Sequence, residues 1–243
     1  MLRQLQEAYD YPVDVEFTAN FLEDKSYRIN LVQCRPFQVK GGGPSVQLPA
    51  TVPAGDLVLE ARGAIIGPSL STTIGRLVFV VPRVYGQLSQ SDRYSVARLI
   101  GRITRLGKPA TGSLMLLGPG RWGTTTPSLG VPVSFAEISR VSVLGEIVEM
   151  REGLVPDVSL GTHFFNDLVE MQMLYLAVFP GHAGHVVNTA LLEAAPNRLV
   201  DLLPEEARWV EAVRVIDAAD LPRGRSLLLA ADVLRQRAVC YVG

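Results

Sequence analysis

The stretch that decides the fold at the start of this chain reads Pro12-Val13-Asp14-Val15-Glu16-Phe17 and returns, after a polar turn, as Leu31-Val32-Gln33-Cys34-Arg35-Pro36. In the first segment apolar residues alternate with Asp14 and Glu16, which is the period of two that is typical of a strand with one apolar face. The second segment alternates in a similar way. The pair therefore predicts a β-hairpin in which the two acids share one face of the first strand, and Gln33 and Arg35 share one face of the second.

These polar residues form a chemically consistent set. Two carboxylates and an amide oxygen on one face suit Mg²⁺, a hard cation that prefers oxygen ligands and bridges nucleotide phosphates. The guanidinium of Arg35 can bind a phosphoryl group through two parallel hydrogen bonds and offset charge that develops during its transfer. The alternative is a surface hairpin whose charges are simply solvated, because exposed pairs of this kind are common.

The same two segments closely resemble the end of the ATP-grasp domain in phosphoenolpyruvate synthases and pyruvate phosphate dikinases. In that family, the strand with the acids and the strand that ends in a glutamine-x-arginine step close over MgATP. The resemblance covers about a sixth of the chain. It implies an ATP-dependent phosphotransferase in which Asp14 and Glu16 are ligands of the Mg-nucleotide, Gln33 supports them at the metal, and Arg35 is the catalytic contact to the transferred phosphates. ATP and Mg²⁺ are the implied cofactors.

The whole chain is predicted to be an α+β protein with four parts. Residues 1–40 are expected to form the end of the ATP-grasp lobe, a short helix plus the hairpin. The run Gly41-Gly42-Gly43-Pro44 opens a linker over 41–55, because glycines carry no side chains that pack. A mixed α/β region of mainly antiparallel strands is expected over 56–180, followed by a small α+β extension over 181–243.

Within the later parts, hydrophobic periodicity predicts several elements. A helix is expected over 91–105, with Ser91 or Asp92 as its cap. A second helical stripe begins near Thr162 and passes into a strand at 174–179, and a further helix is expected over 204–212. Strands are expected at 113–117, 141–150, 213–216, 227–229 and 238–242.

A second group of motifs lies at 117–123 (Leu-Gly-Pro-Gly-Arg-Trp-Gly), 129–133 and 161–165. It is similar to the region that follows the nucleotide domain in uncharacterised bacterial members of the same group. The first motif formally fits the dinucleotide fingerprint G-x-G-x-x-G, but Pro119 stiffens the turn and the following residues do not open a helix that could hold a pyrophosphate. A glycine-rich loop positioned by packing of Trp122 is the preferred interpretation, and Arg121 remains a candidate anion-binding residue.

The three histidines point more weakly to chemistry. His163 lies beside two phenylalanines at the start of an apolar helix, which favours a packed, hydrogen-bonded ring over a role in phosphoryl transfer. His182 and His185 are three residues apart in a loop with no third metal ligand adjacent, which favours a surface loop. The threonine, glycine and histidine motif that carries phosphohistidine in the resembled family is not found in the chain.

Composition narrows the function classes. The 23 basic residues balance 24 acidic ones, so the formal net charge is −1 and nucleic acid is a poor partner. The apolar runs are shorter than the roughly 20 residues that a membrane span needs. The two cysteines, Cys34 and Cys240, have no paired spacing, which is typical of a reducing cytoplasm.

Two functional hypotheses follow. In the first, the chain is the C-terminal part of a phosphoenolpyruvate-synthase-like phosphotransferase, and a missing N-terminal lobe or a separate subunit completes its nucleotide site. In the second, it is a non-catalytic binding or regulatory module that retains the hairpin only as structure. Exposed apolar surface on an incomplete lobe would favour a homo-oligomer.

Overall fold

The computed structural model describes residues 1–9, 13–36, 46–106, 111–149, 158–159, 163–221 and 225–243. By its internal contacts the chain divides into two compact units, Met1–Val39 (unit 1) and Lys40–Gly243 (unit 2). The glycine run that was expected to open the linker lies outside the described residues. Val46 is buried and the Asn188 side chain donates to the carbonyl of Ala54, so the later part of the expected linker is packed into unit 2.

Unit 1 consists of one helix and one hairpin, as the sequence predicts. Helix α1 spans Leu2–Tyr9, and strands β1 (Val13–Phe21) and β2 (Tyr27–Pro36) pair in antiparallel fashion. The turn between the strands is fixed by Asp24, whose carboxylate accepts hydrogen bonds from the backbone and side chain of Ser26. Hydrogen bonding by Ser26 also lowers the pKa of Asp24.

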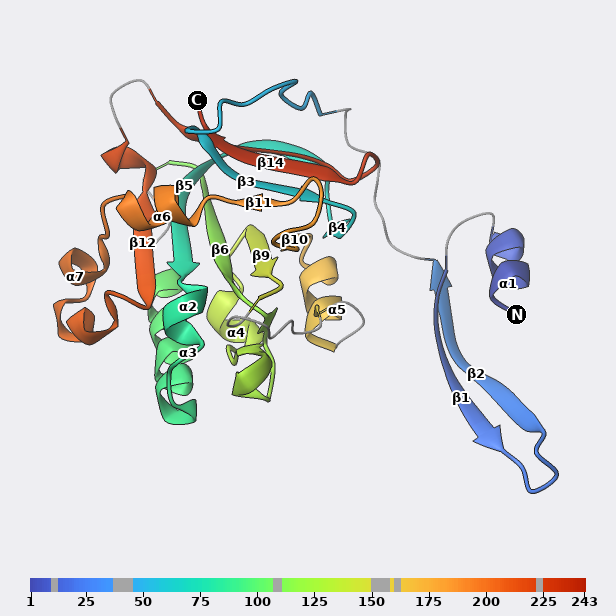
Figure 1. Cartoon of the computed structure of the whole chain (residues 1–243). Helices are drawn as coiled ribbons and strands as arrows, with labels where there is room; N and C mark the ends of the chain where they lie inside the picture. The colour runs from blue at the N-terminus through green and yellow to red at the C-terminus, as the bar shows by residue number, and fades with distance from the viewer. Residues whose placement is uncertain (10–12, 37–45, 107–110, 150–157, 160–162, 222–224) are drawn as a thin grey trace. The chain divides into compact units, whose positions relative to one another are not determined.

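The centre of unit 2 is a block of four parallel strands, in the spatial order β5, β6, β9, β10. Helices α3, α4 and α5 connect them in turn, and Figure 1 shows these three helices on the same side of the unit. That arrangement follows from right-handed crossovers that all advance in one direction along a sheet. The bounds of this block are β5 (Leu70–Val80), α3 (Gln90–Arg105), β6 (Ser113–Pro119), α4 (Phe135–Ile138), β9 (Val143–Ile147), α5 (His163–Glu170) and β10 (Leu174–Val178).

Antiparallel strands extend this block on both sides into one curled ten-stranded sheet. The long strand β5 pairs through its first half with β13 and through its second half with β6 and β12. The order continues from β13 through β14 and β3 to β11, while β4 pairs with β10 at the other end. These strands are β3 (Leu57–Arg62), β4 (Ile65–Ile66), β11 (Val186–Val187), β12 (Val213–Asp217), β13 (Leu227–Asp232) and β14 (Arg237–Val242).

The shorter elements lie in the connections. They are the helices α2 (Pro82–Tyr85), α6 (Thr189–Ala194) and α7 (Leu199–Leu202), the 3₁₀ helices η1 (Pro127–Leu129), η2 (Pro204–Trp209) and η3 (Ala218–Asp220), and a parallel pair of two-residue strands, β7 (Arg121–Trp122) and β8 (Gly130–Val131).

The main core of unit 2 lies between the parallel strands and helices α3 to α5. Val78 and Leu116 from the strands pack with Leu99 and Ile100 from α3, and all four are buried. Neighbours of opposite orientation, such as Phe79, are equally buried, so the strands are covered on both faces. This double burial explains why they read as near-continuous apolar runs in the sequence.

The predicted α+β class is confirmed, with several corrections of detail. Helix α3 is capped by Ser89, whose hydroxyl accepts from the Asp92 amide, and neither Ser91 nor Asp92 is the cap. The segment at 204–212 forms a 3₁₀ helix that begins at Pro204, is kinked at Glu206 and ends at Trp209. Residues 181–243 are not set apart from 56–180, because β13 and β14 lie within the shared sheet between β5 and β3.

Candidate functional sites

The register of the hairpin brings the four predicted site positions together. Asp14 pairs directly with Arg35, and Glu16 pairs directly with Gln33. Residues that are opposite each other in an antiparallel pair lie on the same face of the ribbon, and alternate residues along one strand share a face. The four positions, named here the polar patch, therefore occupy one face at the end of the hairpin that is remote from its turn.

A β-bulge borders the polar patch. Beyond the Glu16–Gln33 pair the register shifts, so that Phe17 faces Leu31 and Val32 is left as the extra residue. Without this shift, simple alternation would place Leu31 and Ile29 on the same face as Gln33 and Arg35. The bulge transfers these apolar residues to the opposite face and so keeps the patch polar. Bulges are frequent next to functional sites, where they redirect side chains.

The opposite face of the hairpin is apolar. Phe17, Phe21 and their partners Leu31 and Tyr27 line it. Phe21 is 82% exposed and Tyr27 65% exposed, and α1, the helix of the same unit, has no buried residue. A two-stranded ribbon of this kind is marginally stable in water by itself. The described part of unit 1 thus presents a polar patch on one side and an uncovered apolar surface on the other.

In unit 2, the glycine-rich loop follows the carboxyl end of β6 and confirms the interpretation based on Trp122. The indole is 1% exposed and donates from Nε1 to the carbonyl of Gly145 at 2.9 Å. The chain continues through β7, the three-residue 3₁₀ helix η1 and β8, so no α-helix opens here to receive a pyrophosphate. Arg121 lies in β7, half-buried, within electrostatic reach of Tyr175.

A buried carboxylate that sequence reasoning missed holds this loop in place. Glu146 of β9 is 0% exposed and accepts hydrogen bonds from the Trp122 amide at 3.0 Å, the Ser159 amide at 2.9 Å, the Ser159 hydroxyl and the Tyr175 hydroxyl at 2.6 Å. Burial raises the pKa of Glu146, and the hydrogen bonds from Ser159, Tyr175 and Trp122 oppose that shift. Burial, together with the neighbouring carboxylate, also raises the pKa of Tyr175, so its hydroxyl remains a donor.

This carboxylate network, Glu146 with Trp122, Ser159 and Tyr175, joins the glycine-rich motif at 117–123 to strands β9 and β10 and to Ser159. Because the carboxylate is enclosed on all sides, no substrate reaches it, and its role is to fix the loop and the Ser159 segment. The signal in the sequence was Glu146 itself, a charged residue with apolar neighbours inside the predicted strand 141–150, since glutamate is almost never fully buried unless it is partnered.

The histidines fall in different environments. His163 is the first residue of α5, and its side chain lies outside the described part. The ring of His182 is exposed and stacks on Phe179, with ring centroids 5.8 Å apart. His185 is half-buried, and its Nδ1 accepts a hydrogen bond from the Phe179 amide at 3.2 Å. Burial and the nearby His182 lower the pKa of His185.

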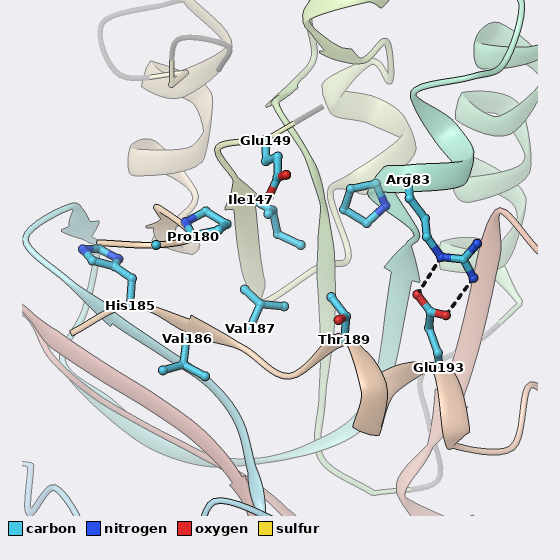
Figure 2. A pocket seen from close by; sticks show the side chains of 11 residues that line it. Arg83, Ile147, Glu149, Pro180, His185, Val186, Val187, Thr189 and Glu193 are labelled. Atoms are coloured by element: carbon cyan, nitrogen blue, oxygen red, sulfur yellow. Dashed lines mark hydrogen bonds and ion pairs between the residues drawn. The ribbon is translucent and has the colours of Figure 1, made fainter. Parts of the chain in front are cut away.

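His185 is also one of the residues that line an open pocket of about 690 Å³ in unit 2. The pocket, named here the edge pocket, lies where β5, β9 and β10 end, and β11 and α6 form its other wall (Figure 2). The crevice beyond the carboxyl ends of parallel strands is where α/β sheets usually bind ligands. Its lining residues are Pro82, Arg83, Ile147, Glu149, Pro180, Gly181, His185, Val186, Val187, Thr189 and Glu193.

Comparisons with known proteins add no family to these observations: no family model, curated protein or solved structure matches the chain. Among the described side chains, no group of three or more His, Cys, Asp or Glu is placed to hold a metal ion. None of the described helices has the length and apolar character that a bilayer span requires.

Proposed function

We propose that this chain supplies one wall of a Mg-ATP site of the phosphoenolpyruvate synthase and pyruvate phosphate dikinase kind, and that it works as part of an ATP-dependent phosphotransferase. The observation that carries the proposal is the register, which pairs Asp14 with Arg35 and Glu16 with Gln33 on one face. In this proposal the two acids and the amide oxygen hold Mg²⁺, and Arg35 contacts the phosphates.

The proposal requires a second lobe, which comes from elsewhere in the polypeptide or from a separate subunit. A two-stranded ribbon has no concave surface and cannot exclude water from a triphosphate. The apolar face lined by Phe17, Phe21 and Tyr27 gives such a lobe a surface on which to pack. We expect ATP to bind weakly to the chain alone and much more tightly once the second lobe is present.

Isothermal titration calorimetry with MgATP tests this expectation, on the chain alone and on the chain mixed with the polypeptide that is encoded directly upstream. The discriminating variant is Arg35→Ala, which removes the proposed phosphate contact. Its matched control is Arg28→Ala, because Arg28 lies on the same strand and, through its pairing with Asn20, on the same face, but beyond the bulge. We expect Arg35→Ala to weaken MgATP about tenfold or more and Arg28→Ala to change it little.

The same titration separates this proposal from the second hypothesis, a non-catalytic module that keeps the hairpin only as structure. That hypothesis is favoured by the independent organisation of unit 2, which has its own core and its own pocket. If the folded chain binds no MgATP either alone or in the mixture, the nucleotide proposal fails and the non-catalytic module remains.

A further inference from the structure

The edge pocket has the dimensions of a ligand site, and the residues that line it all belong to unit 2. Its volume of about 690 Å³ falls within the range of roughly 300–1,000 Å³ that is typical of small-molecule sites. Pro82, Ile147, Pro180, Val186 and Val187 give it apolar walls from four separate parts of the chain. The few polar groups among the lining residues decide which class of ligand the pocket selects.

Two of the charged groups neutralise each other. Arg83 donates to both carboxylate oxygens of Glu193, from Nε at 3.3 Å and from a terminal nitrogen at 2.8 Å, as the dashed lines in Figure 2 show. Hydrogen bonding by Arg83 lowers the pKa of Glu193, so the pair stays ionised. This bidentate ion pair occupies two of the five N–H donors of Arg83 and neutralises its charge, which weakens the attraction of Arg83 for an anionic ligand.

The other charged group among the described lining residues is the carboxylate of Glu149. It follows the end of β9, is half-buried, and receives no hydrogen bond or ion pair from any other described side chain or amide. A half-buried carboxylate that no described group pairs with favours a ligand that brings a positive charge and N–H donors.

His185 adds a hydrogen-bond donor to the pocket, whereas Glu149 is an acceptor. Because Nδ1 accepts from the Phe179 amide, the proton of the neutral ring resides on Nε2, which is left as a donor. Among the described lining residues, the pocket therefore offers the Glu149 carboxylate as an acceptor, the neutral His185 ring as an N–H donor, the Thr189 hydroxyl and apolar walls. The formal charge of these described residues is −1, which opposes phosphate and carboxylate ligands.

We propose that the edge pocket binds a small organic amine, with the ammonium group at Glu149 and the carbon skeleton against the apolar walls. This site does not depend on the nucleotide proposal, because every residue involved belongs to unit 2.

The test is an NMR titration of the ¹⁵N-labelled full chain at pH 7 with three probes that share one ring: benzylamine, benzyl alcohol and benzoate. We expect benzylamine to shift the amide resonances of Val187 and Thr189, benzyl alcohol to do so more weakly, and benzoate to leave them unchanged. In Glu149→Gln, benzylamine should bind about tenfold more weakly. Glu170→Gln, the same change at an exposed acid outside the pocket, should bind it as the wild type does.

A second variant, Thr189→Trp, narrows the pocket at an exposed position without changing any charge, and it should weaken benzylamine and benzyl alcohol alike. Each variant's amide spectrum reports its fold. Benzoate binding as tightly as benzylamine, an unchanged affinity in Glu149→Gln, or no shift of the lining residues with any probe at millimolar concentration would each overturn the proposal. The arginine variant Arg35→Ala should retain amine binding in full, which keeps the outcome distinct from that of the MgATP titration.

Discussion

Two strand glutamates, Glu16 in unit 1 and Glu146 in unit 2, occupy opposite physical situations. Glu16 is exposed on a two-stranded ribbon and faces Gln33 across the strand pair. Glu146 is 0% exposed and receives four hydrogen bonds, two of them from backbone amides. The first carboxylate is open to a ligand, whereas the second is fully used by the protein itself.

The difference follows from the cost of removing a carboxylate from water. A buried carboxylate loses its hydration, and only a full set of donors offsets that loss. Once Trp122, Ser159 and Tyr175 supply those donors, each of them depends in turn on the acceptor. Glu146 therefore contributes to stability and to the position of the glycine-rich loop, while Glu16 is free to contribute to binding.

The largest expected effect is that of Glu146→Ala. The substitution leaves the Trp122 amide, the Ser159 amide and the Tyr175 hydroxyl buried without their acceptor, and it opens a cavity. We expect the free energy of unfolding to fall by about 3–5 kcal/mol, measured by urea denaturation.

The control for this variant is Glu170→Ala, at an exposed position on α5, which should change stability by less than about 0.5 kcal/mol. A loss below about 1 kcal/mol in Glu146→Ala would show that water or other groups replace the carboxylate, and the contrast between the two glutamates would disappear.

Gly123→Ala tests whether packing against Phe164 also constrains the glycine-rich loop that Glu146 holds. Gly123 has a φ of +73°, and a Cβ at this position would lie 2.2 Å from the ring of Phe164. We expect a loss of about 2 kcal/mol, from strain plus overpacking. Gly63→Ala is the matched control, because Gly63 has a φ of +91° with nothing within 4 Å of the added Cβ. Equal losses in both variants would mean that the Phe164 contact adds nothing.

Much of unit 1 could be predicted from the sequence because its determinants are local. Alternation over 13–17 and the polar turn were sufficient for the hairpin and for the face shared by Asp14 and Glu16. The bulge at Val32 was not predicted, because it depends on which residues pair across the ribbon. Alternation alone would have mixed Leu31 with Gln33 and Arg35.

In unit 2, local signals gave the main helices and strands, and non-local contacts decided the rest. The antiparallel strands were expected, but the parallel order of β5, β6, β9 and β10 was not, because sheet order depends on contacts between distant segments. The partners of Glu146 lie 13 to 29 residues away in sequence, and the edge pocket is assembled from five stretches of chain. Neither arrangement leaves a local pattern.

Glu137→Gln should change the free energy of unfolding by an amount between those expected for the substitutions at Glu146 and Glu16. The change should also depend on pH. The Glu137 carboxylate accepts from the amide and hydroxyl of Ser134 at 2.7 and 2.9 Å and pairs with Arg98. Burial raises the pKa of Glu137, but these hydrogen bonds and the Arg98 charge outweigh it, so the net shift is downward.

Because the folded-state pKa lies below the ordinary value of 4.5, the charged form contributes stability above that pH, and the contribution is lost as the pH falls through the folded-state value. Glu137→Gln should therefore cost about 1 kcal/mol at pH 7, and the difference from wild type should shrink when unfolding is repeated below pH 4.5. A difference that stays constant with pH would assign the effect to packing.

The smallest expected effect on stability is that of Glu16→Gln, and it is the one that makes the comparison informative about function. Its side chain is exposed, so the change in unfolding free energy should be below about 0.5 kcal/mol. In the mixture with the second lobe, the same substitution should nevertheless weaken MgATP about tenfold, because it removes one of the proposed Mg²⁺ ligands. A residue that matters for binding and not for folding is what the exposed side chain of Glu16 predicts. If Glu16→Gln instead lowers stability and leaves MgATP affinity unchanged, the polar face of the hairpin serves only as structure.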